Sequence, residues 1–226
     1  MDQKVTIVIP TKNEAKTIEK AIKTIKKYAD ELLIVDGHST DKTREIALEN
    51  NANVVLDQGK GKGSGIRTGI KHAKNNIIVF IDADLSHEPS DIPKLVKPIK
   101  ENHADMVIAS RRRGGSDDLE MNSFGNGFLR QVGNDLLTLI INKRWNVSLT
   151  DIENGFRAIR KDVALKLKLT ANDFDIEQEM VQKCLKKGFR IKEIPSHEYA
   201  RAAGKSKLST FKAACQLPLR LLKDFF

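Results

Sequence analysis

Cysteine is scarce in this chain of 226 residues, which contains only Cys184 and Cys215. Two cysteines provide neither a disulfide framework nor the ligand spacing of a zinc site, and they are typical of a protein in a reducing cytosol. Aromatic residues make up only 5% of the sequence and are not interleaved with basic residues, which argues against a stacking surface for single-stranded nucleic acid. No apolar run reaches the length of a membrane span. A strand is expected to begin at Val5, so we expect no signal peptide.

The chain is strongly basic, with a formal net charge of +9. This charge is compatible with nucleic acid, anionic lipid headgroups and phosphorylated substrates as partners. Basic residues gather at 111–113 and between residues 201 and 207. Because the sequence has no aromatic stacking segment, we expect no nucleic-acid partner.

Strand and helix patterns alternate through the first half of the chain. We expect strands at 5–9, 32–35, 54–56, 77–81 and 106–109, and helices at 14–29, 39–50, 65–73 and 91–102. The second half has apolar-rich helices at 124–142 and 174–187, a strand at 191–194 and an amphipathic helix at 209–226. This order predicts an α/β fold with one mostly parallel sheet flanked by helices, in a single domain that spans residues 1–226.

An aspartate pair, Asp82-Ala83-Asp84, follows the strand expected at 77–81. Side chains two residues apart in an extended segment point the same way, and open α/β sheets bind ligands at the carboxyl ends of their strands. Two converging carboxylates at that edge suit a divalent cation that carries phosphate oxygens. The alternative is a helix cap, but the position of the pair favours the metal site.

Polar residues also follow the other expected strands. The segment 10–14 leads from the first strand into a helix, Asp36 ends the second strand, and Arg111 follows the fifth. Thr11 or Asn13 alone would be interpreted as a helix cap. Asp36 is better suited to accept hydrogen bonds from a base or ribose, and Arg111 to bind phosphate.

The glycine-rich segment 59–65 has two interpretations that the sequence leaves open. It is either a loop that cradles a phosphate or a flexible basic loop. It lacks the spacing of a P-loop and the position of a dinucleotide-binding fingerprint.

Taken in order, these motifs resemble those of the family 2 glycosyltransferases of the GT-A fold, and above all the dolichyl-phosphate mannose and glucose synthases. The likeness covers nearly the whole chain. It rests on segments 9–14, 35–41, 61–63, 82–85, 110–111, 155–158 and 204–208, together with Arg201.

The resemblance implies a role for each matching residue. The nucleoside would be bound by Pro10, Thr11, Asn13, Glu14 and Asp36. The diphosphate would carry Mg²⁺ or Mn²⁺ held by Asp82 and Asp84, with Asp84 the more direct ligand. Arg201, Ser206 and Lys207 would close over the diphosphate, and Lys62 would also bind the substrate. The lipid phosphate would be contacted by Arg111, Arg130 and Asn134, and the sugar would lie near Glu179. Among these, the resemblance implies catalytic roles for Asp84, Arg130 and Lys207.

Three positions depart from the family pattern. Ser86 stands where glutamine is common, so water or Ser86 would replace a third metal ligand. Asn154 stands where serine is common before Gly-Phe-Arg. The second strand ends in one carboxylate, Asp36, whereas the mannose synthases often have two, which favours a UDP-sugar over GDP-mannose as the donor.

The implied reaction is an inverting transfer of a hexose from a nucleotide sugar to a polyprenyl or dolichyl phosphate. Residues 1–115 would form the nucleotide-binding part, and residues 116–226 the acceptor-binding part. One alternative is a family member that acts on a sugar or protein acceptor and uses a base such as Asp151 or Glu179. A less favoured alternative is a noncatalytic protein that binds phosphate or nucleic acid, which gives no reason for the aspartate pair.

The expected C-terminal helix combines apolar residues with Lys212, Arg220 and Lys223. It suits a helix that lies on an anionic membrane, although an ordinary core-packing helix has the same pattern. We therefore expect a cytoplasmic protein in peripheral contact with the cytoplasmic face of the membrane.

Overall fold

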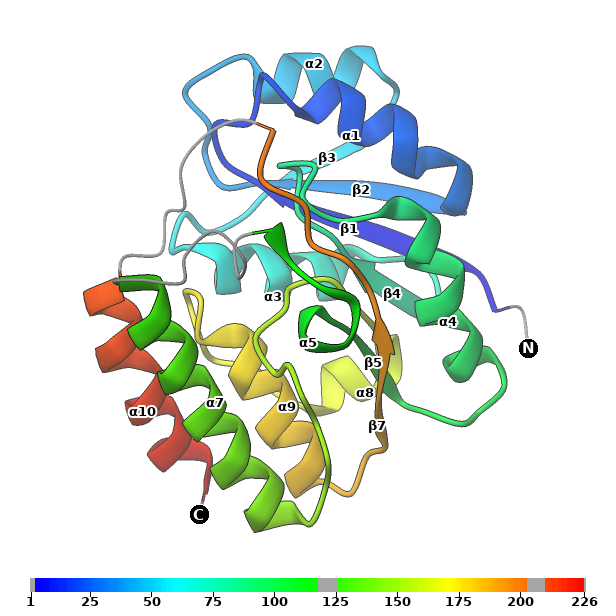
Figure 1. Cartoon of the computed structure of the whole chain (residues 1–226). Helices are drawn as coiled ribbons and strands as arrows, with labels where there is room; N and C mark the ends of the chain where they lie inside the picture. The colour runs from blue at the N-terminus through cyan, green and yellow to red at the C-terminus, as the bar shows by residue number, and fades with distance from the viewer. Residues whose placement is uncertain (1–2, 118–125, 203–209, 226) are drawn as a thin grey trace.

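The computed structural model describes residues 3–117, 126–202 and 210–225 (Figure 1). A seven-stranded sheet runs through the centre in the order β3-β2-β1-β4-β6-β5-β7. Its strands are β1 (Val5–Thr11), β2 (Glu31–Asp36), β3 (Asn53–Leu56), β4 (Ile77–Phe80), β5 (Met106–Ser110), β6 (Arg157–Arg160) and β7 (Ile191–Pro195). Only β6 pairs antiparallel with its neighbours, β4 and β5, within this sheet. The α/β fold with a mostly parallel sheet, predicted from the sequence, is thus confirmed.

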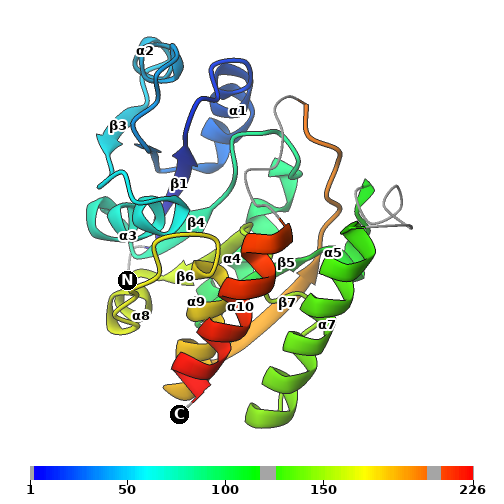
Figure 2. The same ribbon diagram turned by 90° about the vertical axis from the view of Figure 1, so that its left-hand side faces the viewer.

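Helices cover both faces of the sheet. The described α-helices are α1 (Ile18–Ile25), α2 (Thr43–Glu49), α3 (Lys62–His72), α4 (Ile92–Lys100), α5 (Arg111–Gly114), α7 (Asn126–Trp145), α8 (Lys161–Lys166), α9 (Ile176–Lys186) and α10 (Thr210–Phe225). Two short 3-10 segments, Lys26–Tyr28 and Pro89–Asp91, precede β2 and α4. Figures 1 and 2 show α7, α9 and α10 side by side on one face.

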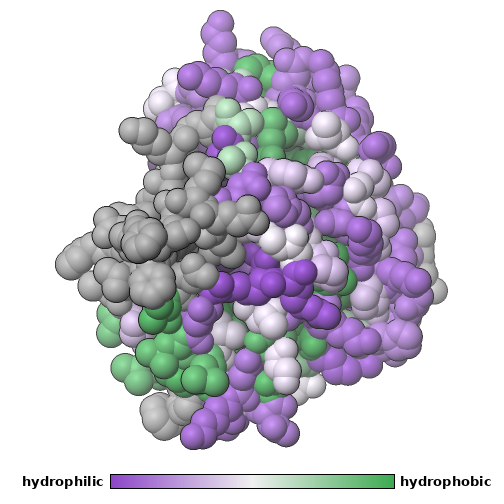
Figure 3. Space-filling model, viewed as in Figure 1, coloured by the Kyte–Doolittle hydropathy of each residue, from purple (hydrophilic) through white to green (hydrophobic). Residues whose placement is uncertain are grey.

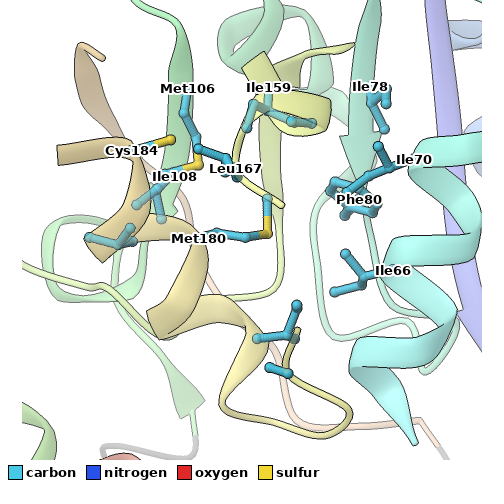
Figure 4. Packing of buried hydrophobic residues seen from close by; sticks show 14 of the residues in the cluster. Ile66, Ile70, Ile78, Phe80, Met106, Ile108, Ile159, Leu167, Met180 and Cys184 are labelled. Carbon is cyan, nitrogen blue, oxygen red and sulfur yellow. The ribbon is translucent and has the colours of Figure 1, made fainter. Parts of the chain in front are cut away.

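Strand residues alternate between two hydrophobic cores because successive side chains point to opposite faces of a sheet. Leu33 and Val35 of β2 face the core under α3, α8 and α9, whereas Leu32 and Ile34 face the core under α1, α2 and α4. Figure 4 shows part of the first core, where side chains of α3, β4, β5 and α9 meet. Both faces are buried, which explains the unbroken apolar runs in the sequence.

Besides the short helix α5, the strand β6 and the helix α8 were not expected from the sequence. β6 lies inside the segment that was interpreted only as a basic motif, and α8 follows it directly. A strand of four residues that begins with an arginine gives no apolar run. Its assignment depends on pairing with β4 and β5, which lie far away in the chain.

The helix expected at 39–50 begins only at Thr43, and the helix expected at 65–73 begins already at Lys62. Within the described parts of the chain, none of the helices is both long and apolar enough to cross a membrane.

Candidate functional site

A cavity of about 330 Å³ opens at the carboxyl end of the parallel strands. It is lined by residues that follow β1, β2, β4 and β5, by the first turn of α3 and by the segments before α9 and after β7. This is the edge at which open α/β sheets bind ligands. Eight of the residues predicted from the sequence line it: Pro10, Thr11, Glu14, Lys62, Asp82, Asp84, Arg111 and Arg201.

Lys62 forms the positive centre of this cavity. Its Nζ lies 3.1 Å from Oδ1 of Asp82 and 3.0 Å from Oε1 of Glu177. Gly155 leaves the space for it, because a Cβ at that position would lie 2.8 Å from the Lys62 Nζ. Burial opposes ionisation of Asp82, but the charge of Lys62 and the hydrogen bond and charge of His87 hold the pKa of this carboxyl below its usual range. Burial opposes the charge of Lys62, but the neighbouring Asp82 and Glu177 raise its pKa above the ordinary value, so the ammonium remains charged.

Asp84 lies beside this group and is almost completely buried. Its Oδ1 accepts hydrogen bonds from the backbone N–H and the hydroxyl of Ser86, at 3.1 and 2.7 Å. Its Oδ2 lies 3.1 Å from Nη1 of Arg201. Ser86 therefore orients the carboxylate, while Arg201 neutralises it. Leu85, between Asp84 and Ser86, has a φ of 64°, a left-handed conformation that non-glycine residues rarely adopt. This turn directs Asp84 into the cavity wall.

Arg111 is held by acidic neighbours. Its Nε and Nη2 donate to the two carboxylate oxygens of Asp151, at 2.7 and 2.9 Å, and its Nη1 lies 3.4 Å from Glu198. Burial opposes the charge of Arg111, but Asp151 and Glu198 raise its pKa above the ordinary value. The two-pronged pair fixes the guanidinium at the cavity edge. Its predicted contact with a lipid phosphate stays a prediction.

The glycine-rich segment 59–65 leads into α3, which begins at Lys62, and Gly61, Lys62 and Gly65 line the cavity. Its predicted role as a phosphate cradle stays a prediction. A Cβ on Gly61 would lie 2.7 Å from the carbonyl oxygen of Asn172, and one on Gly63 would lie 2.4 Å from that of Ala171. The backbone N–H of Ser64 donates to the same carbonyl of Asn172. The glycines therefore let α3 pack against the segment 171–172, and this packing places Lys62 at the cavity.

The residues predicted to bind a nucleoside separate into two groups. Pro10, Thr11 and Glu14 line the cavity, whereas Asp36 and Asn13 do not. Asp36 is fully buried on the α1 and α2 side of the sheet, where its Oδ1 accepts from the backbone N–H of Ser39. Oδ2 of Asp36 and Oγ1 of Thr11, its register partner in the sheet, have no hydrogen-bond partner. Asn13 is exposed and caps the turn at Thr40 with its side-chain oxygen.

Glu179 is not in the cavity, in contrast to its predicted place near the sugar. It is fully buried on the opposite side of α9, where its carboxylate accepts hydrogen bonds from the backbone N–H groups of Thr170 and Ala171 and pairs with Lys183 and Arg220. Glu177, two residues earlier, lines the cavity instead. Because a helix turns by 100° per residue, a shift of two positions moves a side chain to another face.

The remaining predicted residues are elsewhere. Ser206 and Lys207 lie outside the described residues. Arg130 belongs to α7, but its side chain is also outside the description. Asn134 lies on α7, partly exposed, and does not line the cavity.

Several cavity residues were missed as site residues by sequence reasoning. They are Lys12, Asp57, Glu153, Asn154, Asp173, Phe174, Glu177 and Glu198. The end of the strand expected at 54–56 could have signalled Asp57. Glu177 carries no local signal, because its neighbours Gln178 and Glu179 are equally polar.

The cavity offers oxygen ligands for a divalent cation. In the described ranges, no group of three or more His, Cys, Asp or Glu residues is arranged to hold a metal by itself. Mg²⁺ binds through one or two carboxylates and completes its shell with phosphate oxygens and water, so Asp82 and Asp84 fit this mode. His87 adds a nitrogen 3.9 Å from Oδ2 of Asp82, which suits Mn²⁺ as well. Lys62 and Arg201 already hold positive charge at these carboxylates.

Comparison with known proteins gives consistent matches. The family model described as "Glycosyl transferase family 2" matches residues 6–167. Glycosyltransferase AglJ of Haloferax volcanii is 33% identical over 205 residues, which is 88% of this chain and 64% of that relative. A dolichol-phosphate mannosyltransferase of Pyrococcus furiosus is 33% identical over 215 residues, 91% of this chain and 59% of its own length. The chain therefore spans less than two thirds of these two relatives.

Solved structures share the fold. Glucosyl-3-phosphoglycerate synthase of Mycobacterium tuberculosis, crystallised with Mn²⁺, UDP and glucosyl-3-phosphoglycerate, superposes with a TM-score of 0.78 over 99% of this chain and 80% of its own. The sequence identity is 21%, so this match speaks for the fold alone.

Proposed function

The chain belongs to glycosyl transferase family 2, and we propose that it moves a hexose from a nucleotide sugar to the phosphate of a polyprenyl or dolichyl lipid. The observation that carries this proposal is the charge pattern of the cavity. Two carboxylates, Asp82 and Asp84, lie beside three cations, Lys62, Arg111 and Arg201, in one space at the carboxyl edge of the sheet. A metal-bound nucleoside diphosphate has the complementary charges.

The proposed donor is a UDP-sugar, held by a divalent cation on Asp82 and Asp84. The structural relative crystallised with UDP and Mn²⁺ supports a metal-bound nucleotide in this fold. When bound, the metal would neutralise the charge that develops on the leaving diphosphate. Lys62 and Arg201 would share this task, because both already lie within 3.2 Å of the carboxylates concerned.

The surroundings of Asp151 and Glu179, the two bases considered for an alcohol acceptor, favour a phosphate acceptor instead. The second pKa of a phosphate monoester is about 6, so the acceptor is already a nucleophile near neutral pH and needs positioning more than a base. Asp151, one of the bases considered for an alcohol acceptor, is bound by Arg111, and its pKa is lowered: burial opposes ionisation, but the charge and hydrogen bonds of Arg111 outweigh it. Glu179, the other, does not face the cavity. The mannosyltransferase relative supports a lipid phosphate as acceptor.

A sugar or protein acceptor is the second candidate function. Glu177 favours it, because this residue lines the cavity, and its buried Oε2 has no hydrogen-bond partner and could accept a proton from an alcohol. The hexosyltransferase Agl6 of Haloferax volcanii, described as a low-salt glycan biosynthesis enzyme, is 29% identical over 210 residues.

The acceptor would be reached from a membrane surface on the cytoplasmic side. Exposed apolar side chains lie on the two neighbouring helices α7 and α10: Val132, Leu136, Leu139, Leu219 and Leu222. The lower left of Figure 3 shows a hydrophobic area. Lys223 accompanies them on α10. An apolar face with basic residues suits the interface of an anionic membrane. Arg130 and Asn134 of α7, and Ser206 and Lys207, would then contact the acceptor or the diphosphate.

A thermal-shift panel of nucleotide sugars, each with and without Mn²⁺, tests the donor. A ligand that binds the folded state raises its stability, by about 2.7 kcal/mol at a hundredfold excess over the dissociation constant. We expect a UDP-sugar to stabilise the protein only with the metal. A larger shift with GDP-mannose would contradict the assignment. Transfer to a short polyprenyl phosphate, compared with a sugar alcohol, then decides between the two acceptors. Arg130→Ala should weaken binding of the lipid phosphate more than binding of the donor.

A further inference from the structure

Arg220 of α10 makes the most extensive buried ion-pair cluster in the described part of the chain, and it is not in the cavity. Its Nε and Nη2 contact Oδ2 of Asp175 at 2.8 and 2.6 Å, and its Nη1 lies 3.3 Å from Glu179 and 3.4 Å from Asp224. The same nitrogen reaches the hydroxyl of Thr170 at 3.4 Å. Its side chain is only 8% exposed. Three carboxylates of α9 and α10, together with the hydroxyl of Thr170, therefore fix this guanidinium.

The cluster borders the cavity through α9. Asp175 is the N-cap residue of α9, directly after Phe174 and two residues before Glu177. Phe174 and Glu177 both line the cavity. The ion pair with Arg220 therefore holds the first turn of α9 in the position from which Glu177 contacts Lys62.

The cluster also borders the cavity through the segment 170–172. Glu179, paired with Arg220, accepts the backbone N–H groups of Thr170 and Ala171 at 2.8–3.0 Å. The carbonyls of Ala171 and Asn172 press against Gly63 and Gly61, and Asn172 also accepts the N–H of Ser64. This is the contact that sets the start of α3, where Lys62 is the first residue.

We propose that Arg220 is a positioning residue for the transfer reaction, which acts by fixing both sides of the Lys62–Glu177 contact. The inference rests on the proposed function of the cavity. One side is α9, reached through Asp175, and the other is α3, reached through Glu179 and the segment 170–172. Arg220 itself touches neither the cavity nor a substrate. α10 is thereby a part of the active-site framework as well as a candidate membrane helix.

The first test measures structure without activity. Arg220→Met keeps much of the length of the side chain and removes its charge, and Arg220→Lys keeps the charge but not the planar fork. Amide hydrogen exchange should become faster at residues 62–66 and 170–172 in Arg220→Met, and less so in Arg220→Lys. Arg190→Met is the matched control, because Arg190 also pairs with an aspartate, Asp105, away from the cavity. Unchanged exchange at 62–66 in folded Arg220→Met overturns the inference, whether or not transfer has been detected.

The second test uses a double-mutant cycle in the transfer reaction. Misplacing a group by about 1 Å can cost ~100-fold in rate, so we expect kcat of Arg220→Met to fall about tenfold or more, with a smaller change in the KM for the lipid phosphate. If Arg220 acts through Lys62, the loss of kcat in Arg220→Met with Lys62→Met will equal that of Lys62→Met alone, while their effects on Tm add. Additive losses of kcat would show a purely structural role and overturn the inference. Absence of any transfer by the unmodified chain would instead count against the proposed function, and the exchange experiment would still decide the role of Arg220.

Discussion

Nη1 of Arg201 lies 3.1 Å from Oδ2 of Asp84, on the carboxylate that is the best candidate for a metal ligand. The arginine reaches Asp84 because the segment after β7 runs back along the cavity, where the N–H of Ala202 donates to the carbonyl of Asp84 and that of Tyr199 to the carbonyl of Ser86. A metal ion at Asp84 would compete with Arg201, and a diphosphate would give Arg201 a new anionic partner.

Removing Arg201 should therefore strengthen metal binding in the absence of nucleotide. Arg201 is 39% exposed, and exposed pairs contribute up to ~1 kcal/mol, so we expect Arg201→Ala to tighten Mn²⁺ about two- to fivefold. The same variant should bind the nucleotide sugar more weakly in the presence of Mn²⁺, because it lacks a cation that faces the diphosphate. Titration calorimetry with Mn²⁺ alone and with nucleotide measures both. Weaker binding of Mn²⁺ alone would show that Arg201 does not compete with the metal.

Asp84→Asn tests the metal site directly. Asparagine keeps a side-chain oxygen for the hydrogen bonds from Ser86, so the fold should be retained, whereas the charge is lost. We expect metal-dependent transfer to fall by ~100-fold or more. Asp91→Asn is the control, since Asp91 is an equally buried carboxylate that pairs with Lys94 and does not line the cavity. A folded Asp84→Asn protein with normal activity would remove Asp84 from the site.

Gly155→Ala and Gly63→Ala should separate function from stability. The new Cβ at 155 meets the movable end of Lys62, so it should displace the ammonium and lower nucleotide-sugar turnover with little change in Tm. The new Cβ at 63 meets a backbone carbonyl at 2.4 Å, so it should cost about 1–3 kcal/mol of stability.

Gly133→Ala is the control for this pair of substitutions. Gly133 lies in α7 with open space around it, so alanine there should stabilise the helix by ~0.5–1 kcal/mol. Thermal melts and kinetics of the three variants check these outcomes. Equal losses of stability at 155 and 63 would contradict the proposed packing.

Glu177→Gln should lower activity, whereas Glu179→Gln should lower stability. Glu177→Gln should lower turnover, because the carboxylate pairs with Lys62 inside the cavity. Glu179→Gln should destabilise the fold by about 3 kcal/mol, since it breaks a fully buried ion-pair cluster. Denaturant unfolding and steady-state kinetics of both variants distinguish them. A strong loss of turnover in a stable Glu179→Gln protein, with unchanged hydrogen exchange at residues 62–66, would restore its predicted role near the sugar.

The contribution of Glu179 to the free energy of unfolding should also depend on pH. Burial opposes its ionisation, but Lys183 and the N–H groups of Ala171 and Thr170 hold its pKa below the ordinary value. A lowered folded-state pKa gives stability that is present above the unfolded pKa of about 4.3 and is lost as pH falls below it. The difference in unfolding free energy between the unmodified chain and Glu179→Gln should therefore be constant at neutral pH and shrink below about pH 4.

The sequence by itself determined the elements that depend on local patterns. Unbroken apolar runs gave the parallel strands, because such strands are buried on both faces. Polar residues at their carboxyl ends, such as Asp82, Asp84 and Arg111, could be assigned to the cavity because neighbouring parallel strands end at the same edge. The family resemblance rested on the same residues.

Only the tertiary structure decided what depends on distant contacts. β6 became a strand through pairing with β4 and β5, and the glycines at 61 and 63 acquired their role from the carbonyls at 171–172. The direction of a side chain was also beyond the sequence: Glu177 faces Lys62, whereas Glu179 faces Arg220. These choices depend on which faces of α9 are covered by α3 and α10, and no local pattern encodes that packing.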